Sequence, residues 1–330
     1  MITVVTGASG HVGNNLIRAL LAEGRKVRVV VHRNTSPFDG LIVEKIRGDI
    51  CDADSLSAAF TGADVVYHLA ARVSIEMSGW EKLHAINTIG ARNVADACLK
   101  NGVRRLIHFS SIDAIEQKPV DIPVDEKSPP AYGQKHPPYD HSKAAGEAEI
   151  QAAVERGLDA VIINPTAIIG PYDFQPSHQG QMLLSMARGK LPALVKGGFD
   201  WVDVRDVVYG AMQAEKLAPR ASKYILGGRW ASLAEIARMV EQATGTSSPG
   251  FTCPLWLASA GAPLVTAFEH LRRRRPLYTR ASIIAINSNR HISHEKAEQE
   301  LDYHPRPLEQ TIRDTLAWFA GCGQLPKKSK

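Results

Sequence analysis

Two side chains four residues apart, Tyr139 and Lys143, could carry out proton transfer. A helix predicted to open at Tyr139 places both on one face. An ammonium next to a phenol favours the phenolate, so Lys143 is expected to lower the pKa of Tyr139 from its usual value of about 10. Such a tyrosine can donate a proton to a carbonyl oxygen as hydride arrives, or accept one from an alcohol in reverse. Ser110 and Ser111 precede the pair, and a serine hydroxyl there can hold the same oxygen.

The elements that must position these side chains begin at the N-terminus. A short buried strand over residues 2–5 is followed by a glycine turn and a helix that stops at Gly24. Gly7 allows the tight turn, Gly10 lets the backbone approach a pyrophosphate, and Gly13 lets helix and strand pack closely. The helix N-terminus supplies unpaired N–H groups for phosphates, so this order is typical of a dinucleotide-binding unit. The expected cofactor contacts of the turn are Gly7, Ser9, Gly10, His11, Val12 and Gly13.

Short apolar runs alternate with longer amphipathic stretches after this turn. Strands are predicted at residues 26–31, 43–48, 64–71, 104–109, 159–164 and 224–226, and helices at 54–60, 80–101 (holding Asn87), 139–157 and 203–216. This regular alternation predicts an α/β fold with a Rossmann-type doubly wound parallel sheet. The carboxyl edge of such a sheet binds ligands, and Ser110 and Ser111 lie at that edge. The long Pro-rich stretch 117–138 is expected to border the site.

The alternation breaks at residue 171. A helix near 178–189 and an amphipathic helix capped by Ser232 follow, with a short strand before Gly197 between them. We therefore expect a smaller, mainly helical C-terminal substrate-binding domain beside the dinucleotide-binding domain. The expected domains comprise 1–170 with about 201–227 for the dinucleotide, and about 171–200 with 228–330 for the substrate.

The end of the second strand bears on the choice between NAD and NADP. NAD-specific units usually carry an acidic residue there for the ribose hydroxyls. Here the residues are His32, Arg33 and Asn34, and Arg33 can pair with a 2′-phosphate. NADP is therefore the expected cofactor, with NAD as the alternative.

Composition and charge exclude several other classes. The 330 residues carry a net charge of +5 spread along the chain, which is too small to indicate nucleic-acid binding. The four cysteines lie far apart without metal-ligand spacing, and His291 and His294 lack a third ligand nearby, so no metal site is expected. The chain begins directly with a strand and leaves no room for a signal peptide, which favours a cytoplasmic location.

Several short motifs are spread along essentially the whole chain. They are the glycine turn, Gly48-Asp49-Ile50, His68-Leu69-Ala70-Ala71, Ser110-Ser111, Tyr139 with Lys143, Asn164-Pro165, Gly170-Pro171, Asp203-Val204-Arg205-Asp206-Val207 and Arg306-Pro307-Leu308. With these motifs in this order, the chain resembles the extended short-chain dehydrogenase/reductases, which belong to the NAD-dependent epimerase/dehydratase superfamily. Residues 110–113 and 138–143 look most like the dihydroflavonol-4-reductase and 3β-hydroxysteroid dehydrogenase branch. Members of that branch act on ketones and alcohols of bulky apolar molecules.

The resemblance implies a role for individual residues. Ser111, Tyr139 and Lys143 would form the catalytic triad, with Lys143 also holding the nicotinamide ribose. Ser111 is preferred to Ser110 because the second serine carries the role in the sterol-dehydrogenase-like branch. Further cofactor contacts would come from Asp49 and Ile50 at the adenine, from Leu69, Ala70 and Ala71 along the cofactor, and from Pro165 and Ile168 beside the nicotinamide. The residues expected at the substrate are Ser111, Asp113 and Asn164. Because Asn164 stands where many members have Arg, a phosphate-bearing sugar is the less expected substrate.

The leading hypothesis is an NADP-dependent oxidoreductase that interconverts a ketone or aldehyde and an alcohol on a bulky, apolar small molecule. A second hypothesis is an enzyme of another kind, a nucleotide-sugar epimerase or dehydratase with tightly bound NAD. The third hypothesis is a non-catalytic NADP-sensing regulator.

The segment 253–275 is mostly apolar and ends in Arg272–Arg275, and it is too short to span a bilayer. We expect it to close over the substrate as a lid, with peripheral membrane contact as the alternative. The sequence also allows a homodimer.

Overall fold

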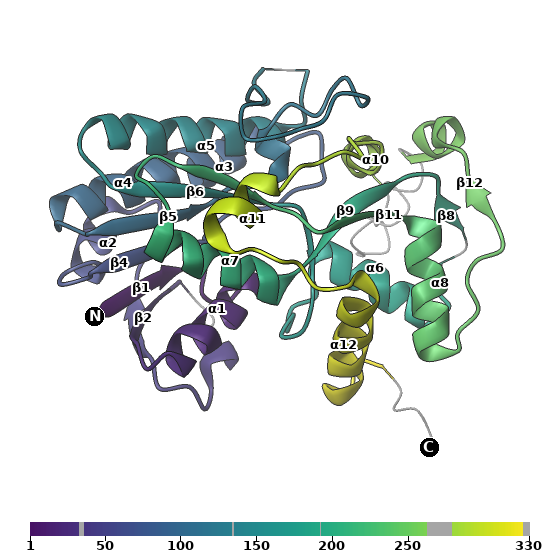
Figure 1. Ribbon diagram of the computed structural model, residues 1–330, viewed down its shortest axis with the longest axis horizontal. Coiled ribbons are helices and arrows are strands. Elements are labelled where there is room, and N and C mark those ends of the chain that lie inside the picture. The colour runs from purple at the N-terminus through teal and green to yellow at the C-terminus, as the bar shows by residue number, and fades with distance from the viewer. Residues whose placement is uncertain (33–35, 134, 192, 263–278, 326–330) are drawn as a thin grey trace.

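The structure is a computed structural model that describes residues 1–32, 36–133, 135–191, 193–262 and 279–325. Arg33 and residues 263–275 of the predicted lid lie outside these ranges. In Figure 1 a large sheet with helices on both faces holds the N-terminus, and a smaller group of helices and short strands lies beside it.

A seven-stranded sheet forms the centre of the larger part. Its strands, in spatial order, are β10 (Lys223–Leu226), β6 (Ala160–Pro165), β5 (Arg105–Phe109), β4 (Val65–His68), β1 (Ile2–Thr6), β2 (Lys26–Val31) and β3 (Glu44–Arg47). Each neighbouring pair is parallel, which confirms the predicted doubly wound, Rossmann-type sheet. The strand order reverses between β1 and β4, and open α/β sheets bind their ligands at such a switch point.

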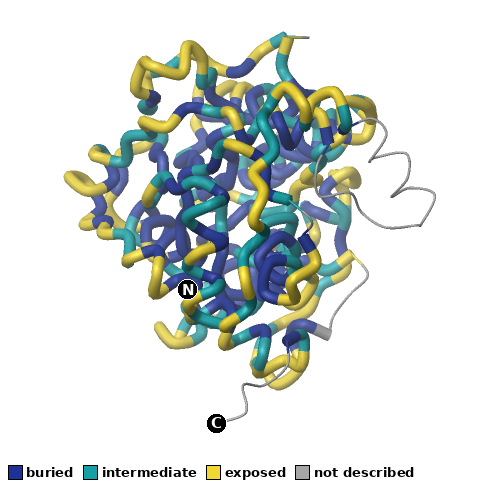
Figure 2. Tube along the Cα trace, turned by 90° about the vertical axis from the view of Figure 1, so that its right-hand side faces the viewer, coloured by how far each residue is buried: buried dark blue, intermediate teal, exposed yellow. Residues whose placement is uncertain are grey.

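Helices cover both faces of this sheet (Figure 1). One face carries α1 (His11–Ala22), α7 (Val204–Leu217) and α11 (Glu295–Leu301), and the other carries α2 (Ala53–Ala59), α4 (Gly90–Lys100) and α5 (Pro138–Glu155). Alternate residues of a strand point to opposite faces, so Tyr67 packs in the first core and Val66 in the second. Both cores belong to the buried centre that Figure 2 shows in dark blue.

The helix predicted over 80–101 forms with one irregularity. α3 (Trp80–Leu83) continues into a π-helical turn (His84–Ile89) and then into α4. Asn87 lies in this turn, where its amide donates to Arg72 O at 3.0 Å and to Ser142 Oγ at 2.9 Å. Such turns frequently occur at functional sites. This one connects the segment after β4 to α5, at the residue before Lys143.

The smaller part has its own sheets and core. β7 (Ala167–Ile169), β9 (Gly198–Asp203) and β11 (Arg229–Ser232) form one sheet, β8 (Leu194–Val195) pairs with β12 (Thr252–Cys253), and the helices are α6 (His178–Ala187), α8 (Leu233–Thr244), α10 (Arg280–Ile286) and α12 (Leu308–Gly321). Trp201 and Phe319 are fully buried in this core. Ser232 caps α8 as predicted, with Oγ accepting from Glu235 N at 3.2 Å. Residues 201–203 belong to this smaller sheet, and the chain returns to the main sheet through α7 and β10.

Two of the short motifs meet in one ion-pair network beside β9. Arg306 donates to Asp206 Oδ1 from NH2 at 2.6 Å and from Nε at 2.8 Å. Arg205 pairs with Asp203 at 2.7 Å and with Asp314 at 2.7 Å. Burial alone would raise the pKa of the Asp203 carboxyl, but hydrogen bonds from Arg205 and the charge of Arg306 outweigh it and lower that pKa. The network joins α7 to the segment before α12.

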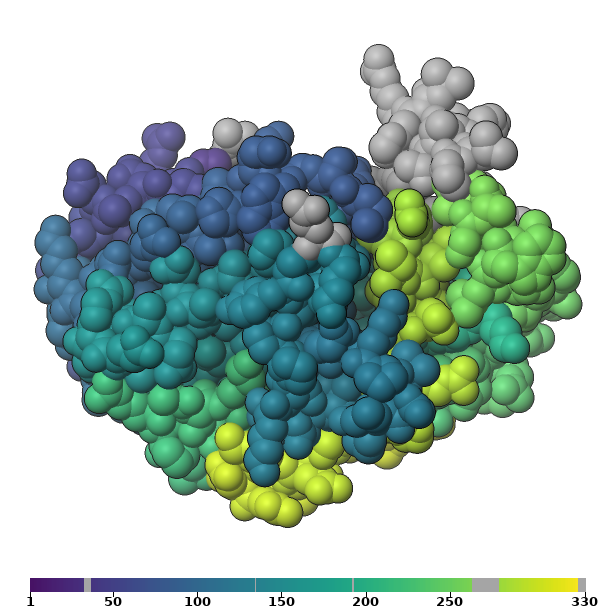
Figure 3. Space-filling model, turned by 90° about the horizontal axis from the view of Figure 1, so that it is seen from above, coloured from purple at the N-terminus to yellow at the C-terminus, as the bar shows by residue number. Residues whose placement is uncertain are grey.

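The segment after β5 lies against the C-terminal part of the chain. Val124 pairs with Ile292 in an isolated bridge, and the amide of Asn289 donates to Ile122 O at 2.5 Å. Figure 3 shows this segment in teal next to the yellow C-terminal residues. Two short 3₁₀ turns, at Ser36–Phe38 and Ile112–Ala114, are the remaining helical elements of the larger part among the described residues.

The described part of the predicted lid is Cys253–Ala262, on which Trp256 and Leu257 are exposed. Its closing over a substrate stays a prediction. Across the described ranges, no helix is both long enough and apolar enough to cross a bilayer.

Candidate active site

The turn between β1 and α1 is shaped for close approach to a phosphate. Gly7 has a φ of +68°, and a Cβ there would lie 2.4 Å from Ala70 N. At Gly13 a Cβ would lie 2.5 Å from the carbonyl oxygen of Gly7, so both positions exclude a side chain. Ser9 and Gly10 are exposed, and no side chain caps α1 at Gly10, which leaves helix N–H groups for an anion. A dinucleotide therefore fits this turn.

Side chains in the first two turns of α1 hydrogen-bond to the segment after β7. His11 Nε2 lies 3.0 Å from Pro171 O, and Asn15 Nδ2 donates to the same carbonyl at 2.9 Å. Val12 packs against the core below the turn. Since its ring is engaged by Pro171, His11 is predicted to contact the cofactor through its backbone.

The ends of β2 and β3 lie on one side of the glycine turn. His32 Nε2 is 3.3 Å from Asp49 Oδ2, and both side chains are exposed. Ile50 is buried below them. Asp49 and Ile50 thus lie at the carboxyl edge, where the resemblance predicts the adenine, while Arg33 lies outside the described residues.

The ends of β4 and β6 supply the remaining predicted cofactor contacts. Leu69 N donates to Thr6 O at 3.2 Å, and the chain becomes exposed from Ala70 to Ala71. Pro165 is buried at the end of β6, and Ile168 is half-buried in β7. The contacts of these residues with the cofactor stay predictions.

Ser111 and Tyr139 come together at the carboxyl edge of β5. The Ser111 hydroxyl lies close enough to the Tyr139 phenol to lower its pKa, and it donates to Asp113 Oδ2 at 3.1 Å. Ser110 Oγ is buried and has no partner among the described residues. Of the two adjacent serines, Ser111 therefore contacts the phenol.

Lys143 lies one turn along α5 from Tyr139 and is 3% exposed. Its Nζ donates to Phe109 O at 2.8 Å. Burial lowers the pKa of Lys143 to about 8, against the opposing charge of Glu147. The ammonium is thus held at the end of β5, two residues before Ser111.

The pKa of Tyr139 is raised, so the expectation that Lys143 would lower it is wrong for this structure. Burial of the phenol is the largest cause, followed by the charge of Asp113, while the Ser111 hydrogen bond partly opposes them. The ammonium of Lys143 is directed at the Phe109 carbonyl instead. Tyr139 is therefore protonated at neutral pH, as a proton donor must be.

Two carboxyl groups lie close to the phenol. Burial raises the pKa of Asp113, against hydrogen bonds from Ser111 and Gln117. Burial and the charge of Asp113 raise the pKa of Asp140 to about 9. Sequence reasoning missed Asp140, although its place directly after Tyr139 in the first turn of α5 was a usable signal.

Asn164 is fully buried, with 0% exposure. Its Nδ2 donates to Ser111 O at 2.8 Å and to Glu147 Oε1 at 2.6 Å. The side chain therefore lies behind Ser111, and its predicted contact with substrate is untested. Glu147 was also missed from the sequence, although its position four residues after Lys143 places it on the same helix face.

Two histidines are buried side by side at the ends of β4 and β5. The rings of His68 and His108 have centroids 5.1 Å apart, and His68 Nδ1 lies 2.7 Å from Thr6 Oγ1. Burial and the charge of Lys143 lower the pKa of His68 to about 3 and that of His108 well below its usual value. Both rings are therefore neutral beside the lysine. Among the described residues, no three His, Cys, Asp or Glu side chains are grouped so as to hold a metal.

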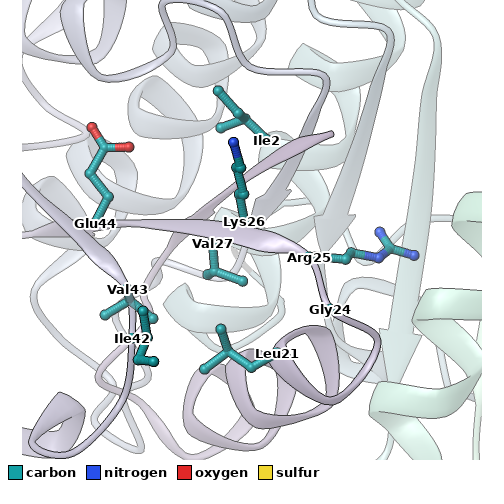
Figure 4. A pocket seen from close by; sticks show the side chains of 9 residues that line it. All are labelled: Ile2, Leu21, Gly24, Arg25, Lys26, Val27, Ile42, Val43 and Glu44. Atoms are coloured by element: carbon teal, nitrogen blue, oxygen red, sulfur yellow. The ribbon is translucent and has the colours of Figure 1, made fainter.

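A surface hollow of about 570 Å³ lies at the opposite edge of the sheet (Figure 4). Its lining residues are Ile2, Leu21, Gly24, Arg25, Lys26, Val27, Ile42, Val43 and Glu44. Ile2, Lys26 and Glu44 begin β1, β2 and β3, whereas the predicted catalytic Ser111 follows the carboxyl end of β5. This hollow is thus separate from the candidate active site.

Comparison with known proteins points to the same class of protein as the geometry of this site, the dinucleotide-dependent enzymes. Residues 3–223 match the NAD dependent epimerase/dehydratase family. Sterol demethylase protein B of Methylococcus capsulatus is 35% identical over 98% of this chain and 100% of its own length. A putative dihydroflavonol 4-reductase of Synechocystis is 33% identical over 97% of this chain and 95% of its own. The crystal structure of gox2253 superposes with a TM-score of 0.86 at 32% identity, covering 98% of this chain and 99% of the other.

The chain therefore belongs to the NAD-dependent epimerase/dehydratase family, within the extended short-chain dehydrogenase/reductases. It is an NAD(P)-dependent enzyme of the reductase and dehydrogenase type, and proteins of this family act on small molecules.

Proposed function

We propose that this chain is an NADP-dependent reductase or dehydrogenase that interconverts a ketone and an alcohol on a bulky apolar molecule. The observation that carries the proposal is that Tyr139 and Lys143 lie one turn apart on α5, where Lys143 Nζ is bonded to the end of β5, just before Ser111. These three side chains lie at the same sheet edge as the glycine turn. When bound there, the nicotinamide supplies or accepts hydride.

Each residue of the triad has its own part in the proton transfer. Tyr139 donates its proton to the oxygen that becomes the alcohol, and Ser111 orients that oxygen by a hydrogen bond. Lys143, as a cation at this sheet edge, would hold the nicotinamide ribose and would favour the phenolate if its ammonium turned toward Tyr139. Burial of the site strengthens each of these electrostatic interactions.

The preference for an apolar, uncharged substrate is supported by the side chains around the triad. Val73 and Met77 are exposed on the segment that follows β4, which Asn87 connects to α5 through its bonds to Arg72 O and Ser142 Oγ. Asp113 would repel a phosphate when ionised, and Asn164 is neutral and directs its amide to Ser111 O and Glu147. The names of the two relatives above refer to a sterol and a dihydroflavonol, which are bulky ring systems.

The test is to follow nicotinamide absorbance with the purified protein on a panel of sterol and flavonoid ketones, their alcohols, and nucleotide sugars. The proposal expects NADPH oxidation with bulky ketones, and NADP reduction with the matching alcohols. Isomerisation of a nucleotide sugar without net cofactor turnover would indicate an epimerase instead. Tight NADPH binding without turnover of any compound would indicate a regulator.

A further inference from the structure

A buried carboxylate, Glu147, is linked through Asn164 to one member of the triad, Ser111. It lies one turn after Lys143 on α5 and is 5% exposed. Its Oε1 accepts from Asn164 Nδ2 at 2.6 Å, and the same Nδ2 donates to Ser111 O at 2.8 Å. Its Oε2 pairs with Lys223 Nζ at 2.5 Å. Both N–H bonds of the Asn164 amide are thus used to link Glu147 to the backbone of Ser111.

We propose that Glu147 is a positioning residue of this site, which acts as the buried counter-charge of Lys143 and, through Asn164, fixes the backbone that carries Ser111. The effect on turnover rests on the proposed function. The effect of Glu147 on the protonation of Lys143 does not rest on the proposed function, because it can be measured by cofactor binding alone.

The counter-charge role follows from the groups that face the lysine. A buried ammonium is costly unless a negative charge offsets the lost hydration. From β4 and β5 the ammonium meets His68 and His108, which are neutral, and its Nζ donates to the uncharged carbonyl of Phe109. The carboxylate of Glu147 opposes the effect of burial on the pKa of Lys143.

The surroundings of Glu147 keep this charge in place. Lys223 faces it from β10, and the Tyr132 phenol lies near enough for the carboxylate to raise its pKa. An arginine at position 164, as in many family members, would place a second cation close to Lys143. Asn164 bridges to Ser111 without adding charge, while Lys223 supplies the positive partner from the neighbouring strand.

The experiment measures the dissociation constant of NADPH by cofactor fluorescence, from about pH 6 to about pH 10, which brackets the Lys143 pKa of about 8. Wild-type affinity should weaken as Lys143 loses its proton. Glu147→Gln keeps the side-chain shape but removes the charge, so the midpoint should move ~1 pH unit lower. Lys223→Met removes the opposing cation, so its midpoint should move higher. Asn164→Ala should leave the midpoint unchanged but lower kcat by about tenfold, because it frees the Ser111 backbone.

An unchanged midpoint in folded Glu147→Gln would overturn the inference. If Glu147→Gln does not fold, the Lys223→Met variant provides the test. A midpoint in Lys223→Met that is unchanged or lower than in wild type would also overturn the inference. Glu147→Asp keeps the charge and should restore the wild-type midpoint. A protein that binds NADPH with these shifts but turns over no substrate would contradict the proposed function and leave the counter-charge role supported.

Discussion

The hydroxyl of Ser111 donates a hydrogen bond to Asp113 Oδ2 at 3.1 Å. The same hydroxyl lies beside the phenol of Tyr139, and the pKa of that phenol is raised by burial and by the charge of Asp113. The protonation state of Asp113 therefore affects how readily Tyr139 gives up or accepts a proton.

Asp113→Asn should alter the pH dependence of alcohol oxidation. In that direction Tyr139 must accept a proton, so the rate rises as the phenol ionises. Removing the negative charge lowers the pKa of Tyr139, and the rising limb of the pH profile should move ~1 unit toward lower pH. Glu116→Gln is the matched control, since Glu116 pairs with Lys135 at 3.1 Å. Identical profiles for wild type and Asp113→Asn would disprove the coupling.

The glycine turn gives a pair of substitutions with different expected effects. At Gly10 a Cβ would lie 3.3 Å from Gly7 O, whereas at Gly13 it would lie 2.5 Å from that atom. Gly10→Ala should therefore weaken NADPH binding by about tenfold with little loss of stability, because its methyl group lies where the pyrophosphate approaches. Gly13→Ala should also lower the melting temperature, because α1 must move away from β1.

Gly250→Ala is the control for these variants, since nothing lies within 4 Å of a Cβ there. Calorimetry and fluorescence titration measure the two effects separately. Gly10→Ala binding NADPH as tightly as wild type would mean that the pyrophosphate does not approach this turn.

Arg33 is predicted to select NADP through its 2′-phosphate. A charge-assisted hydrogen bond is worth about 1.5–3 kcal/mol, so NADP should bind roughly tenfold or more tightly than NAD. Arg33→Asp should reverse the order, because a carboxylate repels the phosphate and accepts from ribose hydroxyls. Competition titrations with both cofactors test this, and equal wild-type affinities would remove the basis for it.

The Asp203 and Asp206 network should contribute to stability in a pH-dependent way. Arg306→Met leaves the buried carboxylate of Asp206 without its partner and should destabilise the fold by roughly 3 kcal/mol. The pKa of Asp203 is lowered in the folded state. Its contribution is therefore fully present above the unfolded pKa of about 4, and it is lost as the pH falls through the lower folded value.

Chemical unfolding of both proteins at about pH 7 and about pH 3 measures this contribution. The gap between wild type and Arg306→Met should narrow at the lower pH. A gap that is the same at both values would show that the ion pairs do not account for it.

The main sheet was predictable because its strands are short apolar runs separated by helices, and parallel strands are buried on both faces. The contact between Ser111 and Tyr139 was predictable for a related reason. A strand end and a helix start that lie near the same sheet edge bring their residues together even when they are distant in sequence.

Other features depend on tertiary contacts that no local pattern encodes. The π-helical turn at Asn87 lies where α5 approaches closely, since a Cβ on Gly146 would lie 2.4 Å from Asn87 O. The raised pKa of Tyr139 depends on burial and on Asp113, so a rule based on Lys143 alone gave the wrong direction. Residues 201–203 pair with β7, and Trp201 also pairs with β11, whereas β-strand propensity cannot select between two sheets.

The central claim is that Tyr139 is the proton donor in a nicotinamide-dependent reduction. The most direct measurement compares kcat and the NADPH dissociation constant of wild type and Tyr139→Phe on the best ketone of the panel. The account predicts that kcat falls by ~10²-fold or more while NADPH binds as before, because the variant keeps the ring and loses only the hydroxyl. Near wild-type turnover by Tyr139→Phe would contradict it.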